Sequence, residues 1–368
     1  MSATLDPVAG AGSGAPAPTI ASTGLTCPVP VATHAHVVLG HGSGGKLSAR
    51  LFAERFWPRF GNPILGQQAD AALLEVAAGT LAMSTDTFVV RPLEFPGGNI
   101  GDLAVNGTVN DLAMMGAEPR WLTCGFVLEE GLPLEVLDRV LEAMAAAARA
   151  TGVTIVAGDT KVVERGKGDG IFINTTGIGM RRAGWAPAPD RIRPGDVVIA
   201  SGPIGRHGTA ILAARDDLGL VTTVTSDTAA LWPLVDALHG ACGDAVRALR
   251  DPTRGGVAST TNELAKSSGV GFRLDEASVP VPPDVTAACE MLGLDPMYVA
   301  NEGVLVAVVA PEAAAAALAA LRSHPLGAQA ARIGAAIADH PGMVTMRTHV
   351  GGTRVVDMLP GDQLPRIC

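Results

Sequence analysis

The sequence TLAMSTDTFVV at residues 80–90, the turn PGGN at 96–99 and the run IGDLAVNGTVNDLAMM at 100–115 together decide the fold class. The first piece is rich in Thr, Val and Phe, which favour β-strands, and the proline and glycines after it end a regular element. The third piece is a run of small and apolar residues long enough for a helix. This order indicates a mixed fold of strands and helices. Asp111 falls inside the apolar run and needs a partner if it is buried.

The same alternation continues toward the C-terminus. In the first half we expect strands at 121–129, 154–156 and 171–180, and a helix at 134–150 with one apolar face. Arg181 to Arg193, which is rich in proline and glycine, is typical of a linker between domains. The second half predicts strands at 196–201, near 272, and at 304–309, 331–337 and 353–357, with helices at 228–238, 245–250, 256–267, 283–291 and 311–323. The fold class is therefore α/β, or mixed α+β, with two domains.

Toward the N-terminus the pattern is strand, glycine loop, helix. A strand at 36–39 leads into the loop GHGSGG at 40–45, and an amphipathic helix is predicted at 46–60. Backbone N–H groups of such a loop can bind phosphate, so the candidate nucleotide-binding residues are Gly42, Ser43, Gly44 and Gly45. Generic phosphate motifs fit only in part, because Leu47 stands where a Walker A motif needs Ser or Thr. A flexible turn without a ligand stays the alternative.

Length and composition limit the class of protein. With 368 residues, 48% of them hydrophobic and 17% charged, the chain is long enough for two packed domains. A net charge of −9 argues against a nucleic acid or an anionic membrane as partner. The five cysteines are scattered without a disulfide or zinc pattern. The sequence shows neither the positively charged start of a signal peptide nor an apolar run of membrane length, so we expect a cytoplasmic protein. We predict a disordered extension at 1–33, domains at 34–182 and 183–358, and a tail at 359–368.

The chain ends in Pro365-Arg366-Ile367-Cys368, which leaves a thiol at the last position. Two prolines and a glycine precede it, so we expect a flexible tail. A tail of this length reaches at most about 26 to 29 Å, which is enough for the sulfur to enter a cleft. The alternative is a frayed end that carries a cysteine by chance.

Four aspartates, Asp86, Asp111, Asp159 and Asp251, each lie at the end of an apolar segment beside Gly, Thr or Asn. Each one alone could be a helix cap or a turn residue. Taken together, such carboxylates can converge on one opening, where hard oxygen ligands suit Mg²⁺ that carries nucleotide phosphates. The sequence therefore makes an ATP site plausible without a Walker fold.

An ordered series of motifs resembles one family closely. The series is HGSGG at 41–45, STDT at 84–87, FPGGNIG at 95–101, ND at 110–111, GAEP at 116–119, GDTKVV at 158–163, DPTRGG at 251–256, NEG at 301–303 and the terminal PRIC. From about residue 34 to 368 the chain resembles the hydrogenase maturation carbamoyl dehydratases, the HypE family. Several of the motifs are shared with the wider superfamily of aminoimidazole ribonucleotide synthetase and selenophosphate synthetase, whereas PRIC marks the narrower family.

The resemblance implies a homodimer with a PurM-like fold, in which N-terminal domains pair to frame an ATP cleft and a C-terminal domain packs on each. It implies that the terminal cysteine receives a carbamoyl group from the carbamoyltransferase HypF. ATP is then used to dehydrate this group to a thiocyanate, and the cyanide passes to iron on a HypC–HypD scaffold for the [NiFe]-hydrogenase centre.

Roles follow for residues of this sequence. Cys368 would carry the substrate group, and Mg²⁺ on Asp86, Asp111 and Asp251 would support phosphoryl transfer. Asp159 and Thr160 would help to bind the nucleotide. Glu302 is the candidate base, because a carboxylate at a strand start between Asn301 and Gly303 can be part-buried with a raised pKa. Lys161 would stabilise negative charge on the activated oxygen or the phosphate.

Non-catalytic roles remain possible for these side chains, since Glu302 could be a surface turn residue and Lys161 a solvated charge. Two rival functions also remain. One is a small-molecule ATP-dependent synthetase or kinase of the same superfamily, for which Cys368 is irrelevant. The other is a carrier without catalysis that only presents the thiol to partners.

Overall fold

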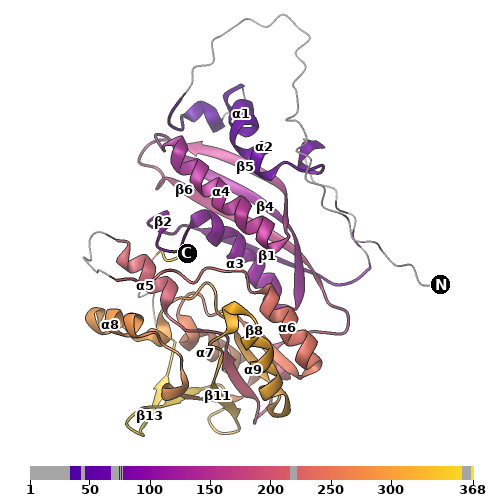
Figure 1. Ribbon diagram of the computed structural model, residues 1–368, viewed down its shortest axis with the longest axis vertical. Helices are drawn as coiled ribbons and strands as arrows, with labels where there is room; N and C mark the ends of the chain where they lie inside the picture. Colours follow the sequence, from indigo (N-terminus) through magenta and orange to yellow (C-terminus); the bar gives the residue numbers. More distant parts are fainter. Residues whose placement is uncertain are drawn as a thin grey trace, which may run out of the picture.

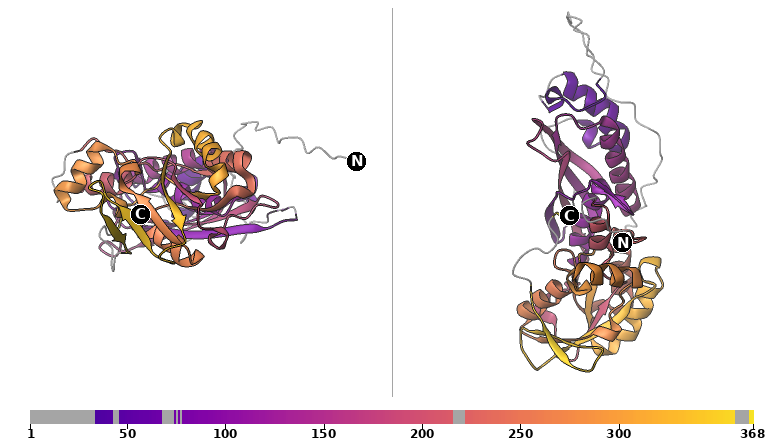
Figure 2. Two further views of the ribbon diagram at one scale, coloured as in Figure 1. Left: turned by 90° about the horizontal axis from the view of Figure 1, so that it is seen from below. Right: turned by 90° about the vertical axis from the view of Figure 1, so that its left-hand side faces the viewer.

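The computed structural model describes residues 34–42, 46–67, 74, 76, 78–215, 222–358 and 366–368. The predicted extension at 1–33, the loop residues Ser43 to Gly45 and residues 359–365 of the predicted tail lie outside the described residues. The described chain forms two stacked parts, each built around its own sheet, and the C-terminus lies between them (Figures 1 and 2).

The first part is organised by a four-stranded sheet in the order β1-β6-β4-β5. Its strands are β1 (Leu81–Phe88), β4 (Ala117–Glu129), β5 (Thr154–Val163) and β6 (Ile171–Arg181). β6 pairs antiparallel with both β1 and β4, whereas β4 and β5 are parallel. A short hairpin of β2 (Glu94–Phe95) and β3 (Gly98–Asn99) precedes the first long helix.

Two helices, α3 (Ile100–Met114) and α4 (Leu134–Thr151), cover one face of this sheet. Asn99 caps α3, since its side chain accepts from Gly101 N and Asp102 accepts in turn from Asn99 N. The helices pack very closely, because a Cβ on Gly101 would lie 2.2 Å from the carbonyl oxygen of Val140. The apolar core between helices and sheet is continuous and includes Leu103, Leu122 and Leu141.

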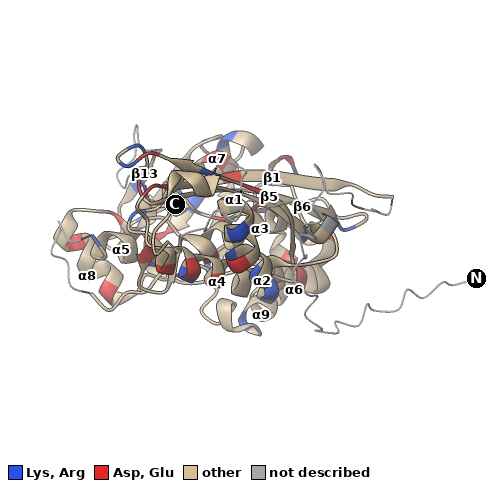
Figure 3. Ribbon diagram, turned by 90° about the horizontal axis from the view of Figure 1, so that it is seen from above, with Lys and Arg blue, Asp and Glu red and all other residues tan. Residues whose placement is uncertain are grey.

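The other face of the four-stranded sheet is open in this chain. Leu81, Met83 and Val127 expose 48%, 72% and 37% of their surfaces. Thr85, two residues after Met83 on the same face of β1, is also exposed. Most of β1 carries no charge (Figure 3). An apolar sheet face of this kind is a feature of interaction surfaces.

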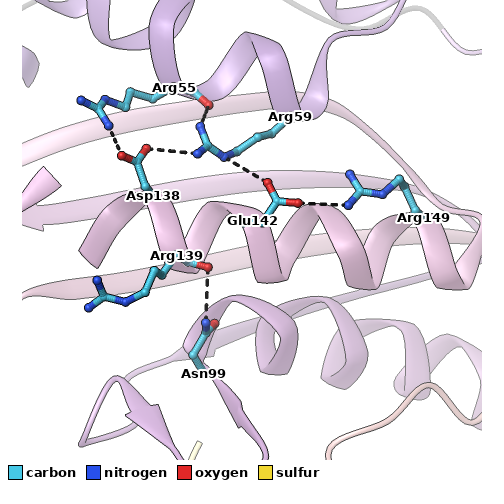
Figure 4. A network of polar contacts seen from close by, with 7 residues as sticks. All are labelled: Arg55, Arg59, Asn99, Asp138, Arg139, Glu142 and Arg149. Atoms are coloured by element: carbon cyan, nitrogen blue, oxygen red, sulfur yellow. Dashed lines mark hydrogen bonds and ion pairs between the residues drawn. The ribbon is translucent and has the colours of Figure 1, made fainter. Parts of the chain in front are cut away.

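The N-terminal segment continues from a 3-10 turn (Leu39–Gly42) into α1 (Lys46–Leu51), a π-helical turn (Phe52–Phe56) and α2 (Trp57–Phe60). Ion pairs fix this segment on α4: Arg55 pairs with Asp138, and Arg59 lies 3.2 Å from Asp138 and 3.6 Å from Glu142 (Figure 4). Arg55 and Arg59 therefore attach this segment, which lies beside β5, to α4.

The second part contains a seven-stranded sheet in the order β13-β12-β9-β11-β7-β10-β8. Its strands are β7 (Val197–Ala200), β8 (Val246–Arg250), β9 (Gly271–Asp275), β10 (Val306–Val309), β11 (Ala331–Ile337), β12 (Val344–Arg347) and β13 (Thr353–Val356). All pairs are antiparallel except β9 with β12. The helices are α5 (Arg206–Ala213), α6 (Trp232–Cys242), α7 (Gly256–Ser268), α8 (Pro283–Leu292) and α9 (Ala314–Arg322).

The central strands of this sheet are buried on both faces. Alternate residues of β7 and β10 pack with α7 on one side and with α6 and α9 on the other. This explains the uninterrupted apolar runs VVIA and VAVV, which a half-exposed strand would not need. Within the described residues no helix is long and apolar enough to cross a membrane.

Four predicted elements were wrong in type or extent. The helix predicted at 228–238 lies four residues further along the chain, as α6. Residues 245–250 form strand β8 rather than a helix, because pairing with β10 outweighs the helix preference of Ala, Leu and Arg. Residues 36–39 make only an isolated bridge at His36 before the 3-10 turn. The strand predicted at 154–156 runs on to Val163, so the motif GDTK lies within β5.

Candidate active site

A cavity of about 210 Å³ lies where the two parts of the molecule and the C-terminus meet. It receives residues from β1, α3, the segment between β8 and α7, the loop before β10, and the tail. Its lining residues are Thr85, Asp86, Gly107, Asp111, Asp251, Thr253, Arg254, Glu302 and Cys368. Four side-chain carboxylates from distant parts of the sequence therefore line one cavity together with the terminal cysteine.

Asp86 and Asp111 come from the stretch that decides the fold. Even-numbered residues of β1 face α3, and Ser84 donates a hydrogen bond of 2.6 Å from Oγ to Asp111 Oδ2. Burial raises the pKa of both carboxyl groups above the ordinary value. The register of β1 on α3 thus presents two carboxylates to the cavity at an energetic cost.

Asp251 lies in the cavity directly after β8, and the effect of burying a carboxylate is largest for this residue among the three aspartates. Burial, and then the negative charge of Asp111, raise its pKa to about 7. Two glycines with positive φ, Gly255 at 74° and Gly256 at 60°, then turn the chain into α7. A Cβ on Gly256 would lie 2.5 Å from the carbonyl oxygen of Met297, so this turn requires glycine.

Glu302 is buried, with 3% of its surface exposed. Burial, followed by the charges of Asp251 and Asp227, raises its pKa well above the ordinary value. The carboxylate of Asp227 accepts from the backbone N–H groups of Glu302 and Gly303, both at 3.2 Å. A Cβ on Gly303 would lie 1.7 Å from the carbonyl oxygen of Asp227, so only glycine allows this contact.

Two buried asparagines hold the loop that carries Glu302. Asn110 donates from Nδ2 to the carbonyl oxygens of Ala229 and Glu302, at 3.0 and 3.4 Å. Asn301 accepts from Gly205 N at 2.7 Å and donates to the carbonyl oxygen of Pro252 at 2.9 Å. The pairs Asn110-Asp111 and Asn301-Glu302 thus each combine a structural amide with a carboxylate in the cavity.

The last three residues bind their own chain. The terminal carboxylate of Cys368 accepts from Val89 N at 3.2 Å, and the carbonyl oxygen of Arg366 accepts from Arg91 N at 3.2 Å. Arg366 has a φ of 55°, which is uncommon for a residue other than glycine, and its guanidinium pairs with Asp169. The tail, which the sequence predicts to be flexible, thus has its described end docked in cis beside the carboxylates.

A second cavity, of about 260 Å³, lies at the other edge of the four-stranded sheet. Its walls are mainly apolar and include Phe52 and Phe56 of the π-helical turn, and its rim carries Gly42, Asp159, Thr160 and Lys161. Lys161 Nζ lies 2.6 Å from Asp159 Oδ2, and this hydrogen bond lowers the pKa of Asp159. An apolar pocket with a few polar groups at its mouth is typical of a ligand site.

The structure therefore divides the predicted site residues between two places. Asp86, Asp111, Asp251, Glu302 and Cys368 meet in the first cavity. Asp159, expected at the same opening, does not join them, because β6 and β4 lie between β1 and β5. Three strand spacings amount to about 14 Å. Thr160, Lys161 and Gly42 share the second cavity, whereas Ser43, Gly44 and Gly45 lie outside the described residues.

Two charged residues that shape the first site, one in its lining and one behind the Glu302 loop, were not predicted from the sequence. Among the described lining residues Arg254 is the only Lys or Arg, and it lies inside the quoted motif DPTRGG, which was the available signal. Asp227 follows a Thr-rich segment with no motif of its own, and its role as acceptor for the Glu302 loop needed the structure.

The donor set of the first cavity fits Mg²⁺. Carboxylate oxygens are its preferred protein ligands, and Asp86, Asp111 and Asp251 supply them. No group of three or more His, Cys, Asp or Glu in the described part of the chain forms a ready-made cage. Asp86, Asp111 and Asp251 are therefore not arranged as a preformed metal cage, and the fit to Mg²⁺ rests on the chemistry of their oxygens.

Replacing Asp251 with asparagine is expected to stabilise the ligand-free protein at pH 8 by roughly 1 to 3 kcal/mol. The raised pKa means that the folded state holds a proton that the unfolded state has lost, so the native protein loses stability as the pH rises from about 4 to about 7. Asp251→Asn removes this loss. Urea unfolding of both proteins at pH 5 and pH 8 measures the effect, and an equal difference at the two pH values would contradict it.

Comparisons with known proteins cover both parts of the molecule. Residues 68–181 match the family model described as AIR synthase related protein, N-terminal domain, and residues 193–346 match the corresponding C-terminal domain. Carbamoyl dehydratase HypE of Rhizobium leguminosarum bv. viciae is 54% identical over 330 residues, which cover 90% of this chain and 94% of that protein. Carbamoyl dehydratase HypE of Escherichia coli K12 is 48% identical, with 90% and 99% covered.

Solved structures give the same result. A crystal structure of hydrogenase maturation protein HypE in complex with ATP has a TM-score of 0.86 and 50% identity, and the match covers 90% of this chain and 99% of that one. The crystal structure of a HypE–HypF complex gives 0.74 and 45%, with 86% and 100% covered. The matches to both family models and to these relatives extend over nearly all of the described chain. This chain is therefore a member of the carbamoyl dehydratase HypE family, within the AIR synthase related proteins.

Proposed function

We propose that this protein uses ATP to dehydrate an S-carbamoyl group on its own Cys368 to a thiocyanate, which supplies cyanide for the iron centre of [NiFe]-hydrogenases. The observation that carries the proposal is the position of Cys368, which lines the same cavity as Asp86, Asp111, Asp251 and Glu302. A frayed terminus that carries a cysteine by chance would not be expected to bind beside these carboxylates.

The reaction converts S–C(=O)–NH₂ to S–C≡N. The amide oxygen attacks the γ-phosphorus of ATP while nitrogen loses its first proton, and phosphate later leaves with that oxygen as nitrogen loses the second. The products are thiocyanate, ADP and phosphate, so the water that is formally removed is consumed in ATP cleavage. The chain must therefore neutralise phosphate charge and accept two protons.

Glu302 is the proposed base for these protons. Its pKa is raised because the cavity is buried and crowded with carboxylates. Cations that enter the cavity lower this pKa and free the carboxylate to accept a proton. Arg254, at the cavity wall, supplies one positive charge beside the reacting oxygens. Proton acceptance thus becomes coupled to the presence of the nucleotide.

Mg²⁺ would be held by Asp86, Asp111 and Asp251, and it would supply charge neutralisation for phosphoryl transfer. The three side chains are already directed into the cavity by β1, α3 and the end of β8. Ser84 fixes the Asp111 carboxylate by its hydrogen bond. These residues therefore orient the phosphates toward the sulfur of the same chain.

We further propose that the nucleotide lies between two copies of this chain. Asp86 on β1 and Gly158 with Asp159 on β5 occupy nearly the same row across the sheet, through Thr175 and Cys124. A twofold axis parallel to the strands would place β1 of one copy against β5 of the other. The adenine of ATP would then occupy the apolar cavity of one chain, with Asp159, Thr160 and Lys161 beside the phosphates. The phosphates would reach the carboxylates of the other chain. The undescribed loop residues Ser43 to Gly45 keep their predicted part in phosphate binding.

Replacing Met83 with glutamate is expected to convert the dimer to a monomer and to abolish ATP-dependent dehydration. Met83 is 72% exposed on the open sheet face, so a charge there costs little in the monomer but much in a buried interface. Sedimentation velocity measures the change. The matched control is Met291→Glu on α8, where the side chain is 76% exposed and the dimer is expected to persist. A dimer that tolerates Met83→Glu would exclude this interface.

The remaining assignments follow from the same proposal. HypF, which a relative binds in a solved complex, would load the carbamoyl group, and a HypC–HypD scaffold would receive the cyanide. The free cysteines Cys124, Cys242, Cys289 and Cys368 suit a reducing cytoplasm. Domain boundaries at 34–182 and 183–358 are proposed because each range contains one of the two main sheets.

The test is to incubate the carbamoylated protein with Mg-ATP and to weigh the C-terminal peptide. We expect the loss of one water from Cys368 together with ADP formation. An unchanged mass without ATP consumption would favour the carrier hypothesis. ATP consumption with a free small molecule, unaffected by removal of Cys368, would favour the synthetase or kinase hypothesis.

A further inference from the structure

The second part of the molecule also holds the docked tail, through Ile367, the residue before Cys368. His207 lies in the first turn of α5 and has no exposed surface (0%), and its Nε2 atom is 2.9 Å from the carbonyl oxygen of Ile367. The Ile367 side chain is itself buried, with 2% exposed. This contact therefore fixes the main chain one residue before Cys368.

The hydrogen-bond pattern sets the form of the imidazole. A carbonyl oxygen can only accept, so Nε2 must carry the proton and donate it to Ile367. Burial lowers the pKa of His207 to about 4, so the ring is neutral and Nδ1 is an acceptor. Ser226 Oγ, 2.8 Å from Nδ1, must then donate to it. Ser226 Oγ also accepts from Thr228 N at 3.1 Å, and this contact uses an oxygen lone pair and leaves the single hydroxyl proton for His207.

The short segment Ser226 to Ala229 connects this imidazole to the proposed base. Ser226 orients His207, while the next residue, Asp227, accepts from the N–H groups of Glu302 and Gly303. Ala229 N donates to the carbonyl oxygen of Glu302 at 3.2 Å. One segment thus sets the position of the tail and of Glu302 relative to each other.

The other polar side-chain contacts of the tail are made at Arg366, one residue further from the sulfur. The Arg366 guanidinium pairs with Asp169 and donates to the carbonyl oxygen of Val89 at 3.0 Å, and Arg215 donates to the carbonyl oxygen of Arg366 at 3.1 Å. The ion pair of Arg366 with Asp169 involves side chains that are 35% and 34% exposed, and such pairs contribute little. A fully buried hydrogen bond to a neutral donor is held more firmly, because no water can replace it. Phe95 packs edge-on against the ring, with centroids 5.6 Å apart, and restricts its rotation.

We propose that His207 is a positioning residue for the dehydration, which holds the terminal thiol and its carbamoyl group against Glu302 by donating a hydrogen bond to the Ile367 carbonyl. The inference rests on the proposed function, since it needs Cys368 to carry the substrate group. His207 does not touch the reacting atoms. Its loss removes one of the hydrogen bonds that dock the tail and so lets the end at Cys368 leave the cavity more often, whereas the backbone contacts with Val89 and Arg91 and the nucleotide sites remain as they are.

The experiment compares full-length protein with the variants His207→Phe and Ser226→Ala, and with His239→Phe as matched control. Phenylalanine keeps the ring and its packing but cannot donate, and His239 lies on α6 against Trp185, away from the tail. The readout is the rate at which iodoacetamide alkylates Cys368, followed by the mass of the C-terminal peptide. We expect this rate to rise about 10-fold in His207→Phe, the factor that follows from one buried hydrogen bond. Ser226→Ala should shift it in the same direction by less, and His239→Phe should leave it unchanged.

Further measurements separate positioning from a merely structural role. Single-turnover loss of water from the carbamoylated tail should slow by a similar factor in His207→Phe, while ATP affinity stays at the native value. Equal alkylation rates in the native protein, His207→Phe and Ser226→Ala would overturn the proposal. If His207→Phe does not fold, Ser226→Ala decides, and an unchanged rate there overturns it. Failure of the proposed function would instead appear as native protein that docks its tail but loses no water.

Discussion

Thiocyanate formation is expected to fall to the detection limit when Cys368 is replaced by serine. The hydroxyl of serine stays protonated at neutral pH and cannot take up a carbamoyl group as a thiolate does. The backbone contacts of Val89 and Arg91 with the tail do not involve the sulfur, so Cys368→Ser should still dock. The measurement is the mass of the C-terminal peptide after incubation with the carbamoyltransferase, carbamoyl donor and Mg-ATP.

The matched control for this variant is Cys242→Ser. Cys242 is a half-buried thiol at the end of α6, far from the cavity in the sequence and absent from its lining. The control should give native amounts of thiocyanate. Product formed by Cys368→Ser at a native rate would remove the terminal sulfur from the reaction and, with it, the basis of the proposed function.

The second large effect is expected for Glu302→Gln, with dehydration slowed by roughly 10² to 10⁴-fold, the usual contribution of a general base. Glutamine fills the same space and keeps the backbone N–H groups that bind Asp227, so the loop should persist. Because burial and neighbouring carboxylates raise the pKa of Glu302, the native rate should increase with pH until this group is deprotonated. The variant should lose that rise.

Single-turnover rates between pH 6 and 9 measure both features. Glu290→Gln, an exposed position on α8, carries the same chemical change and should follow the native profile. A variant that is slow but keeps the native pH dependence would assign proton acceptance to another group, of which Asp251 is the first candidate because its pKa is about 7.

Much of this site could be predicted because local chemistry limits where a carboxylate can stand. Asp111 in an apolar helix needed a partner or a cavity, and Asp251 was expected at the end of an apolar segment; both line the first cavity. Glu302, predicted as part-buried with a raised pKa, is confirmed as a buried group with a pKa in that direction. The prediction of a convergent set thus held for residues at the junction of the two sheets.

The rest depended on pairing that no local pattern reveals. The distance of Asp159 from the other carboxylates follows from strand order, with β1 and β5 at opposite edges, and strand order is a property of the whole sheet. β8 resembles a helix in composition but is a strand because β10 offers it hydrogen bonds. Asp227 and His207 matter only through contacts with the Glu302 loop and the tail, which are remote in the sequence.

The attachment of Cys368 to the chain that surrounds it changes the kinetic order of the reaction. A tethered reactant has an effective concentration fixed by the length of its tether, so once carbamoylated, each site should react at a rate that does not depend on protein concentration. Dilution would slow loading and delivery, which are encounters between molecules, but not the step between them at concentrations where the dimer persists. A free peptide with the sequence PRIC would compete only at concentrations comparable to that local value, in the millimolar range for a short flexible linker.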